Sequence, residues 1–256
     1  MADSFIFNES FGVRGKNVIV TGSSSGIGLE IVRMFARKGA NLLAFDRNEN
    51  KEPQEYARGQ GIDYIGFVGD ITDSVSIRNA VDTALARFGK IDALVNCAGI
   101  AINETLEQYT EEAWDKTLAV NLTGPVRLAL AAGTAMIASG GGSIVNIASQ
   151  AGLVALERHL SYGTAKAGLI QATKQMALEW GRYNIRVNAI SPTVILTPMA
   201  KMNWDNPEGE ALKQIIPSRR FGYPEEVAAC AVYLVSDASA LFNGANLIID
   251  GGYTIQ

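Results

Sequence analysis

The sequence predicts an α/β domain in which helices cover both faces of a parallel sheet. Seven short apolar runs alternate with longer amphipathic segments. Nearly continuous hydrophobicity within the short runs is typical of parallel strands buried on both faces. No linker, charge block or low-complexity stretch divides the 256 residues, so we expect a single domain over residues 1–256. The alternation of strand and helix implies right-handed crossover connections.

The predicted elements follow in a regular order. Strands are expected at residues 18–20, 42–45, 65–68, 93–95, 144–147, 187–190 and 247–249. Helices are expected at about residues 26–38, 74–88, 110–139, 161–182 and 224–236. Residues 197–217 contain three prolines, Trp204 and two methionines in a weak helical pattern. This stretch is predicted to form a mobile substrate cap over a pocket.

The composition excludes several classes of protein. Lys and Arg total 22 against 26 for Asp and Glu, which argues against a nucleic-acid partner. Two cysteines and one histidine cannot build a disulfide framework or an ordinary zinc site, so no metal is expected. Without signal-peptide features or a long apolar stretch, the expected localisation is cytoplasmic, with no membrane partner. The low charged fraction of 19% suggests surface buried between subunits.

A glycine-rich loop follows the first predicted strand and opens a helix. Its candidate cofactor-binding residues are Gly22, Ser24, Ser25, Gly26, Ile27 and Gly28. Glycines there let the backbone approach a pyrophosphate at the positive end of the helix. The spacing G-x-x-x-G-x-G differs from the usual dinucleotide fingerprint, and an ordinary Gly/Ser turn is the alternative.

Asp46 indicates which dinucleotide would bind. It stands eighteen residues after Gly28, at the end of the second predicted strand. A carboxylate there can accept hydrogen bonds from the adenosine ribose hydroxyls and would repel a 2′-phosphate. Arg47 could instead pair with such a phosphate, whereas Ser25 is neutral where a basic residue would help to hold NADP. The balance favours NAD over NADP.

Tyr162 and Lys166 are four residues apart in a helical pattern, which places both side chains on one face. Tyrosine has a pKa near 10 and is a poor base at neutral pH. An ammonium about 4 Å away would supply roughly the 3–4 kcal/mol needed to lower that pKa usefully. We therefore predict that Lys166 makes Tyr162 a general acid/base. Ser149, after the fifth predicted strand, could hold the reacting oxygen or could simply cap a turn.

Together these motifs resemble the classical short-chain dehydrogenase/reductase family over residues 12–254. Further matching pieces are Asp70-Ile71, Asn96-Cys97-Ala98-Gly99, Asn121, Arg186-Val187-Asn188, Ser191-Pro192, Thr197-Pro198-Met199, residues 220–227 and Asp250-Gly251-Gly252. Thr193 replaces the glycine that commonly follows Pro192 in the family. The resemblance implies a Rossmann fold, with a doubly wound seven-stranded parallel sheet and the coenzyme along its carboxyl edge.

The resemblance also implies a role for each matching residue. Tyr162 would be the acid/base, and Ser149 would orient the substrate oxygen. Lys166 would bind the nicotinamide ribose, and Asn121 would hold a water that links Lys166 to solvent. The remaining coenzyme contacts would come from Asp70 and Ile71 at the adenine, from Asn96, Ala98 and Gly99 at the ribose, and from Pro192, Val194 and Thr197 at the nicotinamide. A homotetramer is implied, with helices at about 104–130 and 150–180 pairing across a two-fold axis.

The substrate is the part that the sequence determines least. Besides Ser149 and Tyr162, the pocket candidates are Gln150, Ala151, Leu156, His159, Thr193, Val194, Met199, Met202 and Trp204. Gln150, His159 and Thr193 could read several hydroxyls, although such residues are more often surface or packing residues. The C-terminal residues 250–254 are similar to those of members that oxidise sugar alcohols, of the galactitol and threitol dehydrogenase type. We therefore expect oxidation of a secondary hydroxyl in a small polyol or sugar. A 3-oxoacyl-carrier-protein reductase and a non-catalytic NAD-binding regulator are the alternatives.

Overall fold

One parallel sheet of seven strands forms the centre of the molecule. The computed structural model describes residues 11–49, 51–198, 200 and 204–255. The strand order is β3-β2-β1-β4-β5-β6-β7, so the direction of winding reverses between β1 and β4. Ligands of doubly wound sheets bind outside the carboxyl ends of the strands at such a reversal.

All seven predicted strands are present. They are β1 (Asn17–Thr21), β2 (Asn41–Asp46), β3 (Tyr64–Val68), β4 (Ala93–Asn96), β5 (Gly142–Ile147), β6 (Ile185–Pro192) and β7 (Asn246–Ile249). Most extend one or two residues beyond the apolar run, as at Asn17 and Asp46, because the backbone ladder continues into flanking polar residues. The predicted fold class, a doubly wound seven-stranded parallel sheet, is confirmed.

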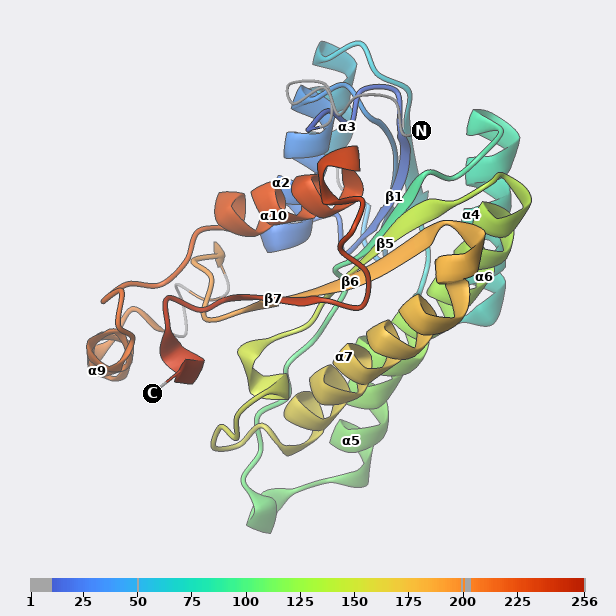
Figure 1. The fold of residues 1–256 in the computed structure, drawn as a ribbon. Coiled ribbons are helices and arrows are strands. Elements are labelled where there is room, and N and C mark those ends of the chain that lie inside the picture. The colour runs from blue at the N-terminus through green and yellow to red at the C-terminus, as the bar shows by residue number, and fades with distance from the viewer. Residues whose placement is uncertain (1–10, 50, 199, 201–203, 256) are drawn as a thin grey trace.

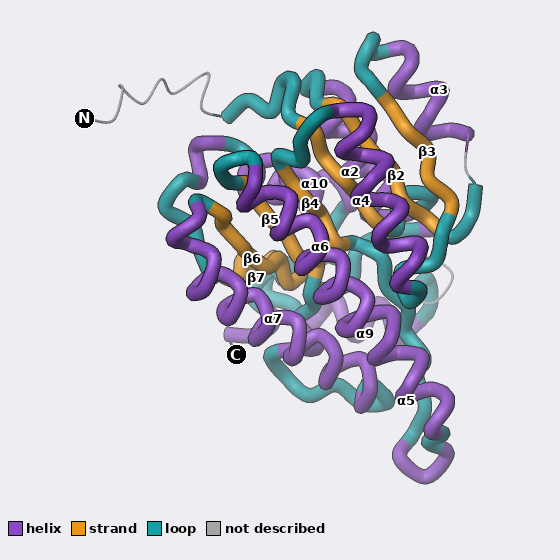
Figure 2. The backbone as a smooth tube through the Cα atoms, turned by 90° about the vertical axis from the view of Figure 1, so that its right-hand side faces the viewer, coloured by secondary structure: helices purple, strands orange, loops and turns teal. Residues whose placement is uncertain are grey.

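Helices cover both faces of the sheet (Figures 1 and 2). On one face lie α2 (Gly26–Arg37) and α10 (Pro224–Val235), with α3 (Lys51–Gly59) beside α2. On the other face lie α4 (Ser74–Phe88), α6 (Gly124–Ala138) and α7 (Leu160–Trp180). The α5 helix (Glu111–Leu118) precedes α6 in the chain and contacts α7. Fully buried side chains such as Phe35 and Leu128 fill the two apolar layers between helices and sheet.

The predicted helix at 110–139 consists of α5 and α6 joined by a π-helical turn at Ala119–Thr123. The joined stretch Glu111–Ala138 is, among the described residues, the one helix long and apolar enough to cross a membrane. Leu128, Ala129 and Met136 are nevertheless fully buried against the sheet, which makes the stretch a core helix. A π-helical turn often marks a functional site, and Asn121 lies within this one.

Two helices lie where the sequence gives a weak or absent pattern. The α3 helix was not predicted, because Pro53 and Ala57 are its only buried residues. Within the predicted cap, α9 (Pro207–Ile215) begins where the Asn206 side chain accepts a hydrogen bond from the Gly209 N–H at 2.8 Å. Two of the predicted pocket residues, Met199 and Met202, lie outside the described residues.

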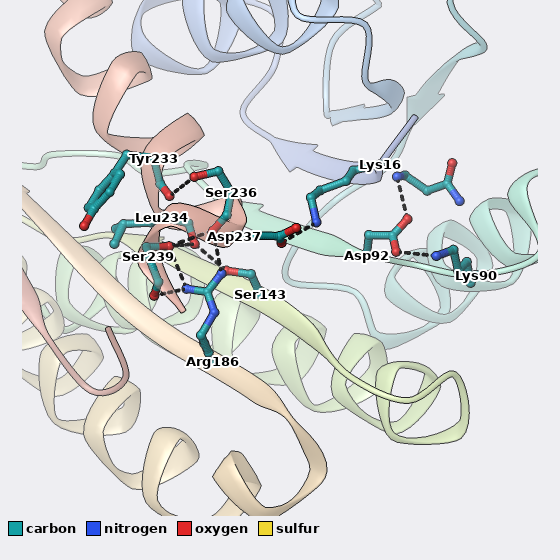
Figure 3. Close-up of polar contacts among 11 residues, drawn as sticks. Lys16, Lys90, Asp92, Ser143, Arg186, Tyr233, Leu234, Ser236, Asp237 and Ser239 are labelled. Carbon is teal, nitrogen blue, oxygen red and sulfur yellow. Dashed lines mark hydrogen bonds and ion pairs between the residues drawn. The ribbon is translucent and has the colours of Figure 1, made fainter. Parts of the chain in front are cut away.

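A polar cluster fixes the amino ends of the strands, opposite the carboxyl edge (Figure 3). Arg186, at the start of β6, donates to the Ser239 carbonyl and hydroxyl at 3.1 and 2.9 Å and to the Ser236 carbonyl at 3.2 Å. Ser236 is the C-cap of α10, and Ser239 ends the short 3-10 helix Asp237–Ser239 that follows it. A cation there is favourable because helix ends carry partial negative charge. Lys16, just before β1, pairs with Asp237 at 3.0 Å. The cluster ties α10 to the sheet.

Candidate active site

The loop between β1 and α2 forms a tight backbone cradle. Gly22 adopts φ +67° and donates its N–H to the Phe45 carbonyl at 2.9 Å. A Cβ atom on Gly28 would lie 2.0 Å from the Gly22 carbonyl oxygen, so neither position tolerates a larger side chain. Ser25 and Gly26 stand at the start of α2, where Ser25 is exposed. The cradle has the open backbone and the helix N-terminus that a pyrophosphate requires.

Asp46 ends β2 beside this cradle, as the sequence predicts. Its carboxylate accepts hydrogen bonds from the N–H groups of Ser24 and Asn48, both at 3.0 Å. Each oxygen keeps acceptor capacity for a further donor. Arg47 is exposed, and no ion pair of Arg47 with Asp46 is found in the described structure. The end of β2 therefore presents the Asp46 carboxylate, with the exposed Arg47 as the next residue.

Thr21 joins β1 to β4 at the carboxyl edge. Its hydroxyl accepts the N–H groups of Cys97 and Ala98, both at 3.0 Å. Thr21 stands in the predicted loop motif but was not counted among the site residues, because only the structure reveals this contact between strands. Asn96 is buried and donates to Asn146 and to the Pro125 carbonyl, so its side chain lies in the interior.

Asn121 is held entirely by main-chain groups. Its Nδ2 donates to the carbonyls of Ile100 and Thr117 at 2.9 and 3.0 Å, and its Oδ1 accepts the Ile100 N–H at 3.2 Å. Gly99 packs against it: a Cβ there would meet Asn121 Oδ1 at 2.8 Å and Lys166 Nζ at 3.7 Å. The Asn121 side chain is thereby fixed beside the ammonium of Lys166.

Ser149, Tyr162 and Lys166 converge at the carboxyl end of β5. Ser149 directly precedes the turn Gln150–Gly152, and its Oγ accepts the Ala151 N–H at 3.1 Å. The same serine hydrogen-bonds with Tyr162. Lys166, which is only 4% exposed, donates to the Ile147 carbonyl at 2.7 Å and lies 5.6 Å from the centroid of the Tyr162 ring. Ser149 thus both caps a turn and contacts the tyrosine.

The pKa values differ from the sequence-based expectation. Burial raises the pKa of Tyr162, and the hydrogen bond with Ser149 opposes this without cancelling it. The prediction that Lys166 lowers this pKa is wrong for the protein alone. The physical reason is that both side chains are buried, and burial disfavours the charged tyrosinate as well as the charged ammonium. It lowers the pKa of Lys166 to about 8.

The predicted substrate residues lie on two neighbouring strand ends and on the start of α7. Buried oxygen atoms of Gln150 (Oε1) and Thr193 (Oγ1) have no hydrogen-bond partner among the described residues. Residue 150 follows β5 and residue 193 follows β6, which pair side by side. His159 Nδ1 lies 2.6 Å from the Glu157 carbonyl, and its ring stands edge-on to Tyr162 at 5.8 Å between centroids.

The remaining predicted coenzyme residues also lie on the carboxyl edge. Asp70 follows β3 and accepts the Thr72 N–H at 2.8 Å, and the neighbouring Ile71 packs closely against Gly124. Pro192 ends β6, and Val194 pairs with Gly222 through a hydrogen bond of 3.0 Å. The rest of this set are Ile27, in the first turn of α2, Ala98 and Gly99, after β4, and Thr197, next to Gly26.

The fold and this cluster define the class of the protein, a dinucleotide-dependent oxidoreductase built on a doubly wound sheet. A family model described as enoyl-(acyl carrier protein) reductase matches residues 22–254. The chain belongs to the short-chain dehydrogenase/reductase family.

Several relatives are similar over nearly their whole length. The chain is 47% identical to the D-threitol dehydrogenase of Mycolicibacterium smegmatis, covering 96% of this chain and 95% of the relative. It is 46% identical to the NAD-dependent glycerol dehydrogenase of Listeria innocua, covering 98% of both. Among solved structures, gox2181 superimposes with a TM-score of 0.95 at 34% identity, covering 98% of this chain and 100% of that chain.

Proposed function

We propose that the protein transfers a hydride between NAD and a secondary hydroxyl or ketone of a small polyol or sugar. The observation that carries the proposal is the convergence of Ser149, Tyr162 and Lys166 beside the glycine cradle. The threitol and glycerol dehydrogenase relatives support a polyol as the substrate class. A regulator that only binds NAD would not need this buried polar cluster.

The residues of the cradle fit a dinucleotide. A Cβ on Gly22 or Gly28 would collide with the backbone of Ala98 or of Gly22, so these glycines permit the tight loop beside which the N-terminus of α2 opens. When bound, NAD would supply the ring that accepts or returns the hydride. Asp46 would accept hydrogen bonds from the adenosine ribose hydroxyls, and its charge would oppose the 2′-phosphate of NADP. The Listeria innocua relative is named as an NAD-dependent enzyme, which also supports NAD as the coenzyme.

The side chains of the cluster would divide the acid–base work. With its raised pKa, Tyr162 holds its proton at neutral pH and can donate it to a carbonyl oxygen during reduction. In oxidation Tyr162 must first lose that proton, so that it can accept one from the alcohol. The rate of oxidation should therefore increase as the pH rises. Ser149 would orient the substrate oxygen, and Lys166 would bind the nicotinamide ribose.

The polar groups around the pocket suit a substrate with more than one hydroxyl. If His159 donates its Nδ1 proton to the Glu157 carbonyl, its Nε2 keeps a lone pair for a substrate hydroxyl. Gln150 and Thr193 each bring an oxygen that has no partner within the described part of the chain. A buried polar atom gains free energy when a ligand supplies its missing partner. These three residues would bind the hydroxyls that do not react.

We also propose a cytoplasmic homotetramer. Leu153, Leu160 and Leu178, on or just before α7, are 40%, 45% and 78% exposed. Leu153 and Leu160 border a cavity of about 710 Å³ beside the start of that helix. Exposed leucines on one long helix are expected where a second copy packs.

The test is the variant Tyr162→Phe, measured with a panel of polyols, sugars, secondary alcohols and 3-oxoacyl thioesters with NAD and NADP. We expect kcat for polyol oxidation to fall by about a hundredfold or more. NADH titration should show that the variant still binds the coenzyme. Unchanged polyol turnover would overturn the catalytic assignment. Preferred reduction of 3-oxoacyl thioesters with NADPH would replace the polyol by an acyl substrate.

A further inference from the structure

The chain ends in a tightly closed turn directly after β7. Asp250 is only 5% exposed. Its carboxylate accepts hydrogen bonds from the Gly252 N–H at 2.8 Å, the Thr254 N–H at 2.8 Å and the Thr254 hydroxyl at 2.7 Å. Three donors on one carboxylate fix the conformation of the turn 250–254, because an unsatisfied buried donor is costly.

Two carbonyls, one just before the turn and one within it, accept hydrogen bonds from segments that are far apart in sequence. The Ile249 carbonyl accepts the Thr193 N–H, and the Gly251 carbonyl accepts the Ser218 N–H, both at 3.0 Å. The second contact is close. Gly251 adopts φ +63°, and a Cβ there would lie 2.1 Å from the Ser218 hydroxyl oxygen. Any side chain at this position must push Ser218 away.

The held segments lead to the coenzyme cradle. Gly222, four residues after Ser218, donates to the Val194 carbonyl at 3.0 Å and accepts the Leu196 N–H at 2.9 Å. Thr197, the residue after Leu196, lies against the glycine loop, because a Cβ on Gly26 would meet the Thr197 methyl carbon at 3.1 Å. A continuous series of contacts therefore joins the C-terminal turn to the glycine loop on the far side of the site.

We propose that the C-terminal turn 250–254 is a positioning element for coenzyme binding. It holds the segment 193–197 against the glycine loop, and Asp250 and Gly251 are its positioning residues. This inference rests on the proposed dinucleotide function and adds to it a determinant that lies outside the cradle. Displacing the turn shifts 193–197 and weakens NADH binding, while the chemistry of the Ser149, Tyr162 and Lys166 cluster is unaffected.

The test is the variant Gly251→Ala, with NADH affinity measured by fluorescence titration. We expect the Kd for NADH and the KM for NAD to rise by about tenfold, with kcat at saturating NAD nearly unchanged. Gly89→Ala is the matched control. Gly89 also has a positive φ, of +79°, but a Cβ there meets no atom of the described residues within 4 Å. A purely structural loss would lower the active fraction, and hence kcat, without raising Kd.

Two further variants keep the test decisive. In Gly251→Ala combined with Ser218→Gly, the hydroxyl that collides is removed, and NADH affinity should recover in part. Thr254→Val removes one of the three donors to Asp250 and should raise Kd more mildly, by about two- to threefold. A wild-type protein that does not bind NADH would overturn the proposed function and this inference together. If the wild type binds NADH and the Kd values of Gly251→Ala and Thr254→Val match that of Gly89→Ala, only the inference is overturned.

Discussion

Replacing Lys166 by methionine should change how protein stability depends on pH. Lys166 is 4% exposed and its pKa falls to about 8 from 10.5, because burial disfavours the ammonium. Since the folded pKa lies below the unfolded one, the unfolded chain binds more protons between pH 8 and 10.5. The buried charge therefore destabilises the protein fully below pH 8, and this penalty is relieved as the pH rises towards 10.5.

The magnitude follows from the two pKa values. A fall from 10.5 to about 8 corresponds to about 3 kcal/mol of destabilisation at neutral pH. Lys166→Met removes this penalty but leaves the Ile147 carbonyl without its donor, at a cost of about 1–3 kcal/mol. That second cost does not depend on pH. The variant should match or exceed the wild type in stability at pH 7 and lose this advantage by pH 10.5.

The assay is urea denaturation of both proteins at pH 7, 8, 9 and 10. Protein concentration is held constant, because subunit association would add to the measured stability. The quantity of interest is the difference in unfolding free energy between the two proteins, in which titrating groups that do not interact with Lys166 cancel. It should move in favour of the wild type by about 2–3 kcal/mol over this range. If the difference in unfolding free energy stays constant with pH, the argument that burial destabilises the Lys166 ammonium is refuted.

Two other perturbations test the coenzyme preference and the support of the sheet. Asp46→Ala should reduce the ratio of kcat/KM with NAD to that with NADP by about tenfold, since the carboxylate is lost; a constant ratio would contradict the assigned preference. Arg186→Met removes donors to two carbonyls and a hydroxyl, those of Ser236 and Ser239. Chemical denaturation should show a loss of about 2–3 kcal/mol, and the coenzyme ratio should not change; full stability would show that the cluster does not anchor α10.

The strands could be predicted because each is an apolar run buried on both faces. Helices with a buried stripe, such as α2 and α4, could be predicted for the same reason. The α3 helix could not, because its nine residues are mostly charged or polar and only Pro53 and Ala57 are buried. The π-helical turn at Asn121 was also beyond the sequence, because its local composition does not differ from that of a regular helix.

The residues of the candidate site could be named from motifs, but their environment could not. Motif spacing places Tyr162 and Lys166 on one helix face, and the structure brings Ser149 to the tyrosine. The spacing does not say how deeply the pair is buried, and burial decides both pKa values. Main-chain partners leave no trace in sequence either. Examples are the Ile147 carbonyl that receives the ammonium and the Gly251 carbonyl that holds Ser218.

The burial of Lys166 connects the stability argument with the proposed reaction. Oxidation of an alcohol releases a proton at Tyr162 that must leave the site in every turnover. An ordinary lysine, with a pKa of 10.5, would hold its own proton far too tightly at neutral pH to pass one on. With a pKa of about 8, the ammonium of Lys166 exchanges protons with its surroundings much more readily. The same desolvation that costs about 3 kcal/mol therefore provides a proton-exchanging group next to the tyrosine. This is why Lys166→Met is expected to maintain or raise stability at pH 7 while it loses turnover.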